Sequence, residues 1–204
     1  MLVNNIKKSI KNLGRQSLYA LLIHDPLTLL GLNKNFFLEE LDFAKKSGLI
    51  KKYGISVYSP NEFYEVTDQL NVELVQLPLN IFDQRFLKSG CLKHLYQNKI
   101  EVHARSLFLQ GSLLEATTPN LLLNWNPYFV RLRERCKELG FSLLEYCIAF
   151  AKSSLFEGSS LVIGVTSRKE LSDILEAFSK DIQLENWKNF ACDDLELIDP
   201  RKWN

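Results

Sequence analysis

Paired cysteines, long apolar runs and excess charge are all missing from this sequence, and each absence excludes a class of protein. The four cysteines, Cys91, Cys136, Cys147 and Cys192, form no Cys-x-x-Cys pair, which argues against a zinc knuckle or a redox motif. No apolar run approaches the roughly 20 residues that a membrane helix needs. The stretch 18–23 follows basic residues, but it is too short for a secretory signal and no cleavage site follows it. We therefore expect a soluble cytoplasmic protein with reduced thiols.

The charge balance excludes partners that are recognised by a strong field. Twenty-five basic and 24 acidic residues leave a net charge of +1, so we expect neither nucleic acid nor an anionic membrane as a partner. His94 and His103 have no carboxylate at a ligand spacing, so we expect no metal site. His24-Asp25 also matches the dyad of metal-dependent phosphohydrolases, but a dipeptide without further histidines is poor support for that activity.

The chain has the length and composition of one globular domain, residues 1–204, with 46% hydrophobic and 24% charged residues. Short apolar runs bounded by Gly, Pro, Asp or Ser recur along it. Nearly continuous apolar runs are typical of strands that are buried on both faces of a parallel sheet. The sequence therefore predicts five strands, within residues 18–26, 51–60, 72–80, 100–108 and 160–167.

Amphipathic stretches of helical length separate these strands. Ser59 has the character of an N-cap, and Pro60 suits the first helical position. The predicted helices are Leu38–Lys46, Pro60–Leu70, Arg85–Asn98, Tyr128–Ser154 with a break at Gly140, and Arg168–Lys180. Alternating strands and helices imply right-handed crossovers and an α/β fold. The pattern fits an open doubly wound sheet or part of a (β/α)8 barrel, and chain length alone favours the open sheet, because a closed barrel takes about 250 residues.

Polar residues gather where the predicted strands end, which is where both architectures bind ligands. They occur within six motifs, each of them weak alone. The motifs are Leu21-Leu22-Ile23-His24-Asp25-Pro26, Gly54-Ile55-Ser56, Val75-Gln76 with Asn80, Ser106 to Gly111, Gly164 to Leu171, and Ile198-Asp199-Pro200 with Trp203. In this order and spacing they resemble the aldo-keto reductases.

The resemblance implies an N-terminally truncated member of that family. Its fold would be a partial (β/α)8 TIM barrel of about five βα units, strands four to eight, with a C-terminal helix and tail. Val3–Leu13, with Ser9 to Gly14, resembles the family's third helix. The segment before it would carry the catalytic aspartate, tyrosine and lysine, and none of this chain's tyrosines matches the proton donor.

The resemblance also implies a role for each strand-end residue. His24 would orient and polarise a carbonyl, although a histidine at a strand end is often only a core residue. Ser56 and Gln76 would hold the nicotinamide carboxamide, with Val57 where the family often has asparagine. Arg105 would stack on the nicotinamide or form a structural ion pair. The pyrophosphate and the adenosine end would be held by Ser106, Phe108, Gln110 and Gly111, and by Thr166, Ser167, Glu170 and Asp173, respectively.

The function so implied is NAD(P)H-dependent reduction of a small carbonyl compound, impaired in this chain. Arg168 and Lys169 hint at NADP, but an ordinary solvated helical turn has the same residues, so both NADP and NAD stay open. The alternative is a non-catalytic dinucleotide-binding or interaction module, whose exposed sheet edges invite self-association. An open α/β enzyme of unrelated chemistry is less favoured, because no Gly-x-Gly-x-x-Gly or Walker loop follows the first strand.

Overall fold

The computed structural model describes residues 2–31 and 33–203. The chain divides into two compact units. Unit 1 is the chain up to Leu77 together with His94–His103, and unit 2 is Pro78–Lys93 together with the chain from Ala104 onwards. The single domain that chain length suggests stays a prediction.

Five strands form one sheet in the order β1-β2-β3-β4-β5, so neighbours in sequence are neighbours in the sheet. Their bounds are β1 Leu18–Ile23, β2 Ile50–Ser56, β3 Leu74–Pro78, β4 Glu101–Arg105 and β5 Ser160–Leu161. The boundary between the units passes through the ends of β3 and β4. A doubly wound sheet reverses its strand order at a switch point. This sequential order has no switch point and is the order found in a barrel.

The register in unit 1 aligns the C-terminal ends of the first three strands. β1 and β2 are parallel, with Ile23 opposite Ile55, and β2 and β3 are parallel, with Ser56 opposite Gln76. Gly54 lies opposite Leu74, and a β-carbon on Gly54 would come within 2.0 Å of the Leu74 carbonyl oxygen. The close approach of these two backbones explains why a glycine stands in the middle of β2.

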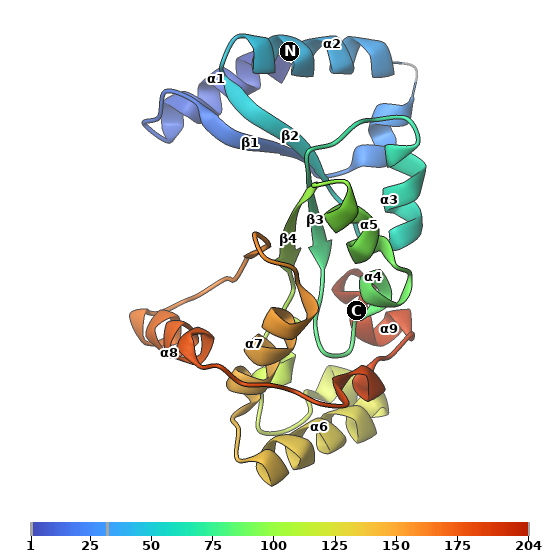
Figure 1. The fold of residues 1–204 in the computed structure, drawn as a ribbon, viewed down its shortest axis with the longest axis vertical. Coiled ribbons are helices and arrows are strands. Elements are labelled where there is room, and N and C mark those ends of the chain that lie inside the picture. The colour runs from blue at the N-terminus through green and yellow to red at the C-terminus, as the bar shows by residue number, and fades with distance from the viewer. Residues whose placement is uncertain (1, 32, 204) are drawn as a thin grey trace. The chain divides into compact units, whose positions relative to one another are not determined.

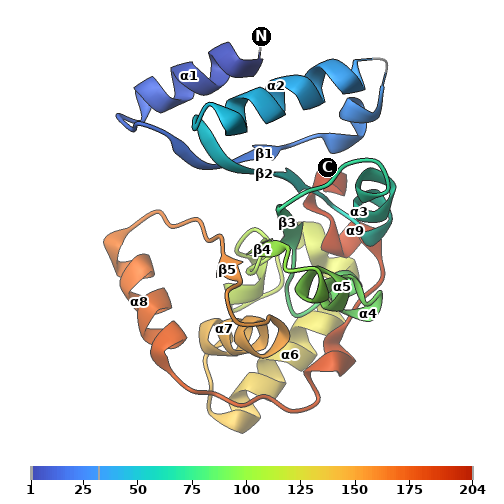
Figure 2. The same cartoon turned by 45° about the horizontal axis from the view of Figure 1, so that its top comes forward.

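In unit 1, α1 (Leu2–Asn12) and α2 (Lys34–Lys46) lie side by side on one face of β1 and β2 (Figures 1 and 2). Ile6, Ala44 and Ile50 form the buried core between them. α3 (Pro60–Thr67) begins as expected, since the Ser59 hydroxyl accepts a hydrogen bond from the Glu62 N–H at 3.2 Å.

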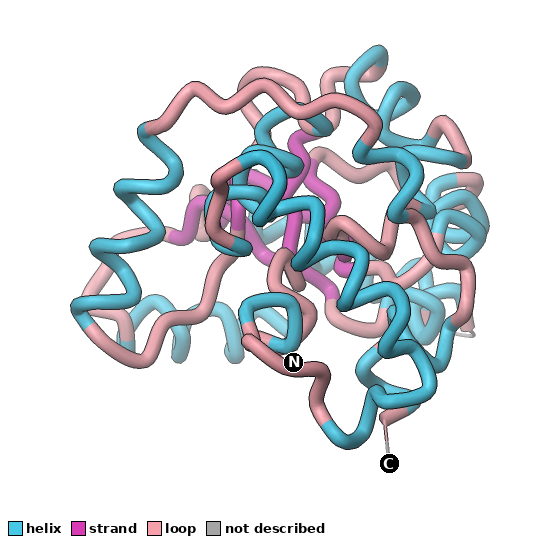
Figure 3. The backbone as a smooth tube through the Cα atoms, turned by 90° about the horizontal axis from the view of Figure 1, so that it is seen from below, coloured by secondary structure: helices cyan, strands magenta, loops and turns pink. Residues whose placement is uncertain are grey.

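Unit 2 consists mainly of helices and loops, which also make up most of the whole backbone in Figure 3. Its core includes Leu107, Ile148, Ala151 and Ala177, contributed by the segment after β4 and by two helices. The helices are α4 Arg85–Lys88, α6 Asn126–Leu139, α7 Leu143–Ser154, α8 Arg168–Ser179 and α9 Leu195–Ile198, while α5 (Cys91–Gln97) crosses the boundary between the units. Within the described ranges, no helix is both long and apolar enough to cross a membrane.

Two glycines end helices by adopting left-handed backbone angles. Gly140, with φ 72°, ends α6, and Ser142 then starts α7 through a capping box with Glu145, as the predicted break requires. Gly90, with φ 76°, likewise divides the predicted helix Arg85–Asn98 into α4 and α5, which the sequence analysis missed. A positive φ favours glycine because it has no β-carbon.

The last strand lies within the predicted run 160–167 but fills only its start. β5 has two residues, although the Val162 N–H still donates to the Ala104 carbonyl oxygen at 2.8 Å. A strand is held by its neighbours, and in the described part of the chain only β4 lies beside β5. The residues from Val162 to Ser167 therefore continue as a loop that leads to α8.

Candidate functional site

The sheet of unit 1 brings three predicted site residues into one row. His24 directly follows Ile23, whose partner is Ile55, and Ser56 is paired with Gln76. In a parallel sheet, residues at equivalent register point to the same face. His24, Ser56 and Gln76 therefore line the same face at the C-terminal ends of β1, β2 and β3, with Ser56 4% exposed and His24 open to solvent.

An aromatic ring borders His24 in this row. The Tyr58 ring meets the His24 ring edge-on, with 6.4 Å between the centroids. The Tyr58 N–H donates to Glu62 Oε2 at 2.6 Å, so the side chain of Tyr58 is carried on a backbone that is tied to the first turn of α3. Exposure and an aromatic neighbour allow the imidazole of His24 to meet a bound molecule, which a buried core histidine cannot do.

Near the opposite ends of the strands, unit 1 has a charged cluster that the sequence analysis did not foresee. Glu101 Oε2 accepts from the Tyr19 hydroxyl at 2.6 Å and from Lys52 Nζ at 2.7 Å, and Glu101 Oε1 lies 2.9 Å from His103 Nε2. Burial alone raises the pKa of Glu101, but hydrogen bonds from Lys52, Tyr19 and His103 outweigh it and lower this pKa to about 2. The Glu101 hydrogen bond raises the pKa of Lys52 to about 12.

This cluster joins β1, β2 and β4, and alternate polar residues on neighbouring strands were its only signal in the sequence. Tyr19 is near the N-terminal end of β1, whereas His24 follows the C-terminal end of the same strand. Tyr19 is thus held by Glu101 and Lys52, and the length of β1 separates it from His24.

In unit 2, the segment after β4 makes a tight turn with an unusual backbone. Four of its residues, Ser106, Leu109, Gln110 and Gly111, have φ values of 62°, 45°, 56° and 86°. In a turn that mixes right-handed and left-handed residues, successive N–H groups can point to one side and form a concave nest that binds anions. No atom of the described chain lies within 4 Å of the position of a Gly111 β-carbon, so within the chain it is the left-handed backbone angle that favours glycine here.

The hydrogen bonds within this turn leave several N–H groups without an acceptor in the described chain, those of Gln110 and Gly111 among them. The N–H groups of Leu109, Ser112 and Leu113 donate to carbonyl oxygens of the turn at 3.0 to 3.2 Å. For the N–H groups of Gln110 and Gly111, no acceptor is found among residues 2–31 and 33–203. Gln110 is exposed, so both donors belong to a segment that solvent reaches. Two adjacent free N–H groups match the needs of a phosphate oxygen.

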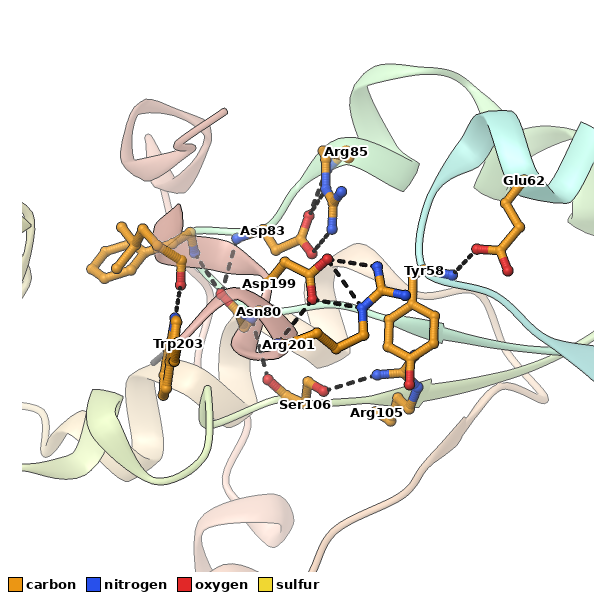
Figure 4. A network of polar contacts seen from close by, with 12 residues as sticks. Tyr58, Glu62, Asn80, Asp83, Arg85, Arg105, Ser106, Asp199, Arg201 and Trp203 are labelled. Carbon is orange, nitrogen blue, oxygen red and sulfur yellow. Dashed lines mark hydrogen bonds and ion pairs between the residues drawn. The ribbon is translucent and has the colours of Figure 1, made fainter. Parts of the chain in front are cut away.

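Arg105 and Asn80 hold the start of the turn (Figure 4). An Arg105 guanidinium nitrogen donates to the Ser106 hydroxyl at 3.3 Å, and Asn80 Nδ2 donates to the Ser106 carbonyl oxygen at 3.2 Å. Asn80 Oδ1 in turn accepts from the N–H groups of Phe82 and Asp83, at 3.0 and 2.9 Å. Asn80 is fully buried, so its amide fixes the Ser106 backbone from inside unit 2.

Phe108 of the turn and Ile174 of α8 pack against the same core cluster of unit 2. This cluster links the turn to α8, where the residues predicted to hold the adenosine end lie at and near the N-terminus. Ser167 caps that helix, α8, by accepting from the Glu170 N–H at 3.1 Å. Glu170 accepts from the N–H and the hydroxyl of Thr166, which lowers its pKa. Capping thus occupies three of the residues that we expected at the adenosine end.

The basic pair at the start of α8 has two different environments. Lys169 Nζ lies 2.8 Å from Asp173 Oδ2 in an exposed i,i+4 pair, and Asp173 raises the pKa of Lys169. Arg168 has no hydrogen-bond or ion-pair partner among the described residues. Of the two, Arg168 is the cation that is available to an outside anion.

The C-terminal motif is a structural clamp in unit 2. Asp199 accepts from the Arg201 N–H at 3.2 Å and pairs with the Arg201 guanidinium at 2.6 Å, and this pairing lowers the pKa of Asp199 (Figure 4). The Trp203 indole N–H donates to the Leu197 carbonyl oxygen at 3.2 Å.

A second ion pair of unit 2 lies at the start of α4. Asp83, fully buried, forms a two-point pair with Arg85 at 2.8 and 2.7 Å.

Comparison with known proteins gives a match to one family. The model of the aldo/keto reductase family matches residues 1–193. No curated protein matches the chain. An aldo-keto reductase from Bacillus halodurans superposes with a TM-score of 0.71 at 19% identity, covering 92% of this chain and 65% of that one. An aldo/keto reductase from Brucella melitensis gives 0.64 at 17% identity, with 92% and 66% covered.

The silkworm aldo-keto reductase AKR2E5, in a structure described as complexed with NADPH, gives a TM-score of 0.63 at 17% identity, with 91% of this chain and 58% of that chain covered. This chain therefore spans less than two thirds of the length of these relatives. The coverage and the sequential strand order confirm the expected partial barrel of α/β type.

Proposed function

This chain belongs to the aldo/keto reductase family, and from that membership we propose that it binds a nicotinamide dinucleotide and takes part in the reduction of a small carbonyl compound. The observation that carries the proposal is the turn Ser106–Gly111, with four left-handed residues and with the N–H groups of Gln110 and Gly111 free of acceptors in the described chain. A pyrophosphate is the part of a dinucleotide that such a nest suits best. Arg105, beside the Ser106 hydroxyl, adds positive charge at the same place.

The row His24, Ser56 and Gln76 in unit 1 has side chains suited to binding the nicotinamide and the carbonyl group. A carboxamide both donates and accepts hydrogen bonds, and Ser56 and Gln76 offer both functions. A bound nicotinamide supplies the hydride. His24, exposed at the end of β1, would orient the carbonyl oxygen through its ring N–H.

We propose that turnover by the 204-residue chain is slow. Tyr19 is held in the Glu101 cluster, near the other end of β1 from His24. Tyr58 is the tyrosine that contacts the His24 ring, and the family resemblance assigns it no catalytic role. Loss of a general acid lowers a rate by about 10²–10⁴-fold. Binding without efficient turnover is therefore the expected behaviour.

A titration of the purified chain that follows NADPH fluorescence tests the binding. Arg105→Ala removes one charge-assisted contact, for which about tenfold weaker binding is the expected result. Lys93→Ala is the matched control, because it removes an exposed cation of unit 2 that is not part of the turn. Equal affinities of all three proteins, with circular dichroism showing intact folding, would overturn the assignment of the turn.

A carbonyl-reduction assay on the same samples distinguishes the reductase from the second candidate, a non-catalytic dinucleotide-binding module. The free N–H groups of Gln110 and Gly111 favour dinucleotide binding in both cases. Slow turnover that His24→Ala abolishes supports the reductase, and binding with no turnover supports the module. Rapid turnover would contradict the proposal that this chain lacks an efficient acid.

We also propose a cytoplasmic location, supported by the cysteines. All four are free and buried. Burial raises the pKa of Cys136 to about 11 and that of Cys91 to about 12, which keeps both thiols protonated at neutral pH. Buried, unpaired thiols are typical of proteins from a reducing compartment.

A further inference from the structure

The loop that follows β3 in unit 2 carries buried polar side chains. Asn80, Asp83 and Gln84 are 0%, 0% and 2% exposed. A buried polar side chain is costly unless it forms hydrogen bonds, so each of the three needs a partner inside the unit. Where these partners lie shows what the loop holds in place.

The Asn80 side chain uses both ends of its amide (Figure 4). Its Oδ1 accepts from the N–H groups of Phe82 and Asp83 at 3.0 and 2.9 Å, which fixes the side chain to its own loop. Its Nδ2 donates to the Ser106 carbonyl oxygen at 3.2 Å. Both contacts together need a side chain that is donor and acceptor at once. Aspartate lacks the donor at neutral pH, and an apolar residue lacks both functions.

The Ser106 carbonyl oxygen is the point on which the following turn closes. It accepts from the Leu109 N–H at 3.0 Å as well as from Asn80, so both of its lone pairs are used. Ser106 has φ 62° and Leu109 has φ 45°. Such angles persist in non-glycine residues only where the surrounding structure holds them. The Asn80 amide contributes to this hold, because it fixes the direction of the Ser106 carbonyl.

The loop is itself anchored at two further points. The Asp83 carboxylate pairs with Arg85 at 2.8 and 2.7 Å. Gln84 Nε2 donates to the Ile81 and Trp187 carbonyl oxygens at 2.8 and 3.1 Å, and Trp187 belongs to the C-terminal part of unit 2. A loop held in this way gives Asn80 a fixed support.

We propose that Asn80 is a positioning residue for dinucleotide binding, an inference that rests on the proposed function. Through the Ser106 carbonyl it holds the turn Ser106–Gly111 in the backbone conformation that presents the N–H groups of Gln110 and Gly111 to the pyrophosphate. Asn80 is fully buried and does not touch the dinucleotide. Its replacement therefore weakens binding by releasing the turn, and not by removing a contact to the ligand.

Asn80→Asp tests the proposal, because it keeps the size of the side chain and replaces the donor by a second oxygen. At pH 7 this oxygen faces the Ser106 carbonyl oxygen, and we expect the Kd for NADPH to rise at least about tenfold. Gln84→Glu is the matched control, since it makes the same exchange in the same buried loop, at a side chain whose partners, Ile81 and Trp187, lie outside the turn. Its Kd should stay within about twofold of the wild-type value.

The pH dependence distinguishes a hydrogen bond to the turn from a general loss of stability. A protonated aspartic acid is again a donor, and burial favours the protonated form. The NADPH affinity of Asn80→Asp, divided by that of the wild-type chain at the same pH, should therefore recover as the pH falls from about 8 to about 5. Gln84→Glu should show no such recovery.

Amide hydrogen exchange without dinucleotide tests the conformation of the turn separately from binding. The Leu109 N–H, which donates to the Ser106 carbonyl oxygen, should exchange at least about tenfold faster in Asn80→Asp than in Gln84→Glu. If this difference is present but the wild-type chain binds no NADPH, the proposed function fails and the hold of Asn80 on the turn stands.

A second pair of variants covers the case in which Asn80→Asp does not fold. Asn80→Ala and Gln84→Ala introduce no charge, and the same titration and exchange measurements compare them. Equal exchange of the Leu109 N–H in the two members of a pair would overturn the proposal. Equal NADPH Kd values in the two members, or no recovery of Asn80→Asp in acid, would overturn it as well.

Discussion

Replacing Glu101 with glutamine tests the account of the charged cluster in unit 1. Glu101 accepts hydrogen bonds from Tyr19 and Lys52 on one oxygen and faces His103 with the other. Glutamine has the same size and keeps one acceptor, but it removes the negative charge that compensates Lys52. The cluster joins three strands, so its loss destabilises the sheet and not a single turn.

The size of the expected loss in the free energy of unfolding follows from how exposed Lys52 and Glu101 are. A shielded hydrogen bond to a charged group contributes about 1.5–3 kcal/mol, and an exposed ion pair about 0.2–1 kcal/mol. The side chain of Lys52 is 32% exposed and that of Glu101 is 16% exposed, which places the pair between these limits. We therefore expect Glu101→Gln to lower the free energy of unfolding by about 2 kcal/mol at pH 7.

The pH dependence gives a second, independent readout. The folded-state pKa of Glu101, about 2, is below its ordinary value of 4.5. Its contribution is therefore fully present above pH 4.5 and is lost as the pH falls through about 2. The folded-state pKa of Lys52, about 12, is above its ordinary value of 10.5, so that contribution is present below pH 10.5 and is lost as the pH rises through about 12.

Urea unfolding at a series of pH values, followed by circular dichroism, measures both effects. The difference between the wild-type chain and Glu101→Gln should be largest near neutral pH and shrink below pH 4.5. Glu65→Gln, which neutralises an exposed carboxylate of α3 with no described partner, is the control and should leave the midpoint unchanged. A difference that is absent at pH 7, or that grows in acid, would refute the reasoning.

Three further substitutions test individual contacts. Arg168→Ala should raise the NADPH Kd about fivefold and leave NADH binding unchanged. Lys169→Ala should raise the NADPH Kd less, because Asp173 already neutralises Lys169. An equal loss of affinity for both dinucleotides would contradict a 2′-phosphate contact. Gly54→Ala should destabilise by at least about 3 kcal/mol, because its β-carbon meets the Leu74 carbonyl at 2.0 Å, whereas Gly164→Ala, with open space around it, should unfold with an unchanged midpoint. Ser142→Ala should cost about 1 kcal/mol by removing the capping box of α7, and Ser153→Ala in the same helix serves as its control; equal midpoints for the two would argue against the cap.

Local sequence signals predicted the elements well where the chain itself decides them. Ser59 with Pro60 marked the start of α3, and Gly140 with Ser142 marked the break before α7. These signals rest on hydrogen bonds between residues within four positions, so they can be read from the sequence. The length of β5 could not be read in this way, because a strand extends only as far as its neighbour pairs with it.

The candidate site was predictable to the same extent. Strand-end position alone aligned His24, Ser56 and Gln76, because the register of parallel strands follows from their apolar patterns. The Tyr19–Glu101 contact joins residues 82 positions apart, and no local pattern encodes such a contact. The sequence also did not show that Lys169 is paired while Arg168 is not, since this difference depends on which of the two cations Asp173 contacts.

The backbone of the Ser106–Gly111 turn is strained. Substitutions that change this strain therefore show whether the main chain or a side chain of the turn binds the dinucleotide. Each non-glycine residue at a left-handed φ costs about 1–2 kcal/mol, and Ser106, Leu109 and Gln110 all have such angles. Burial of Leu109 offsets part of this cost, but exposed Gln110 buries little. If the N–H groups bind the dinucleotide, Gln110→Gly keeps the donor, relieves the strain and leaves NADPH affinity within about twofold. Gln110→Val, with a β-branched side chain at φ 56°, should instead destabilise the turn and weaken binding. A loss of affinity in Gln110→Gly as large as in Gln110→Val would mean that the side chain, and not the nest, makes the contact.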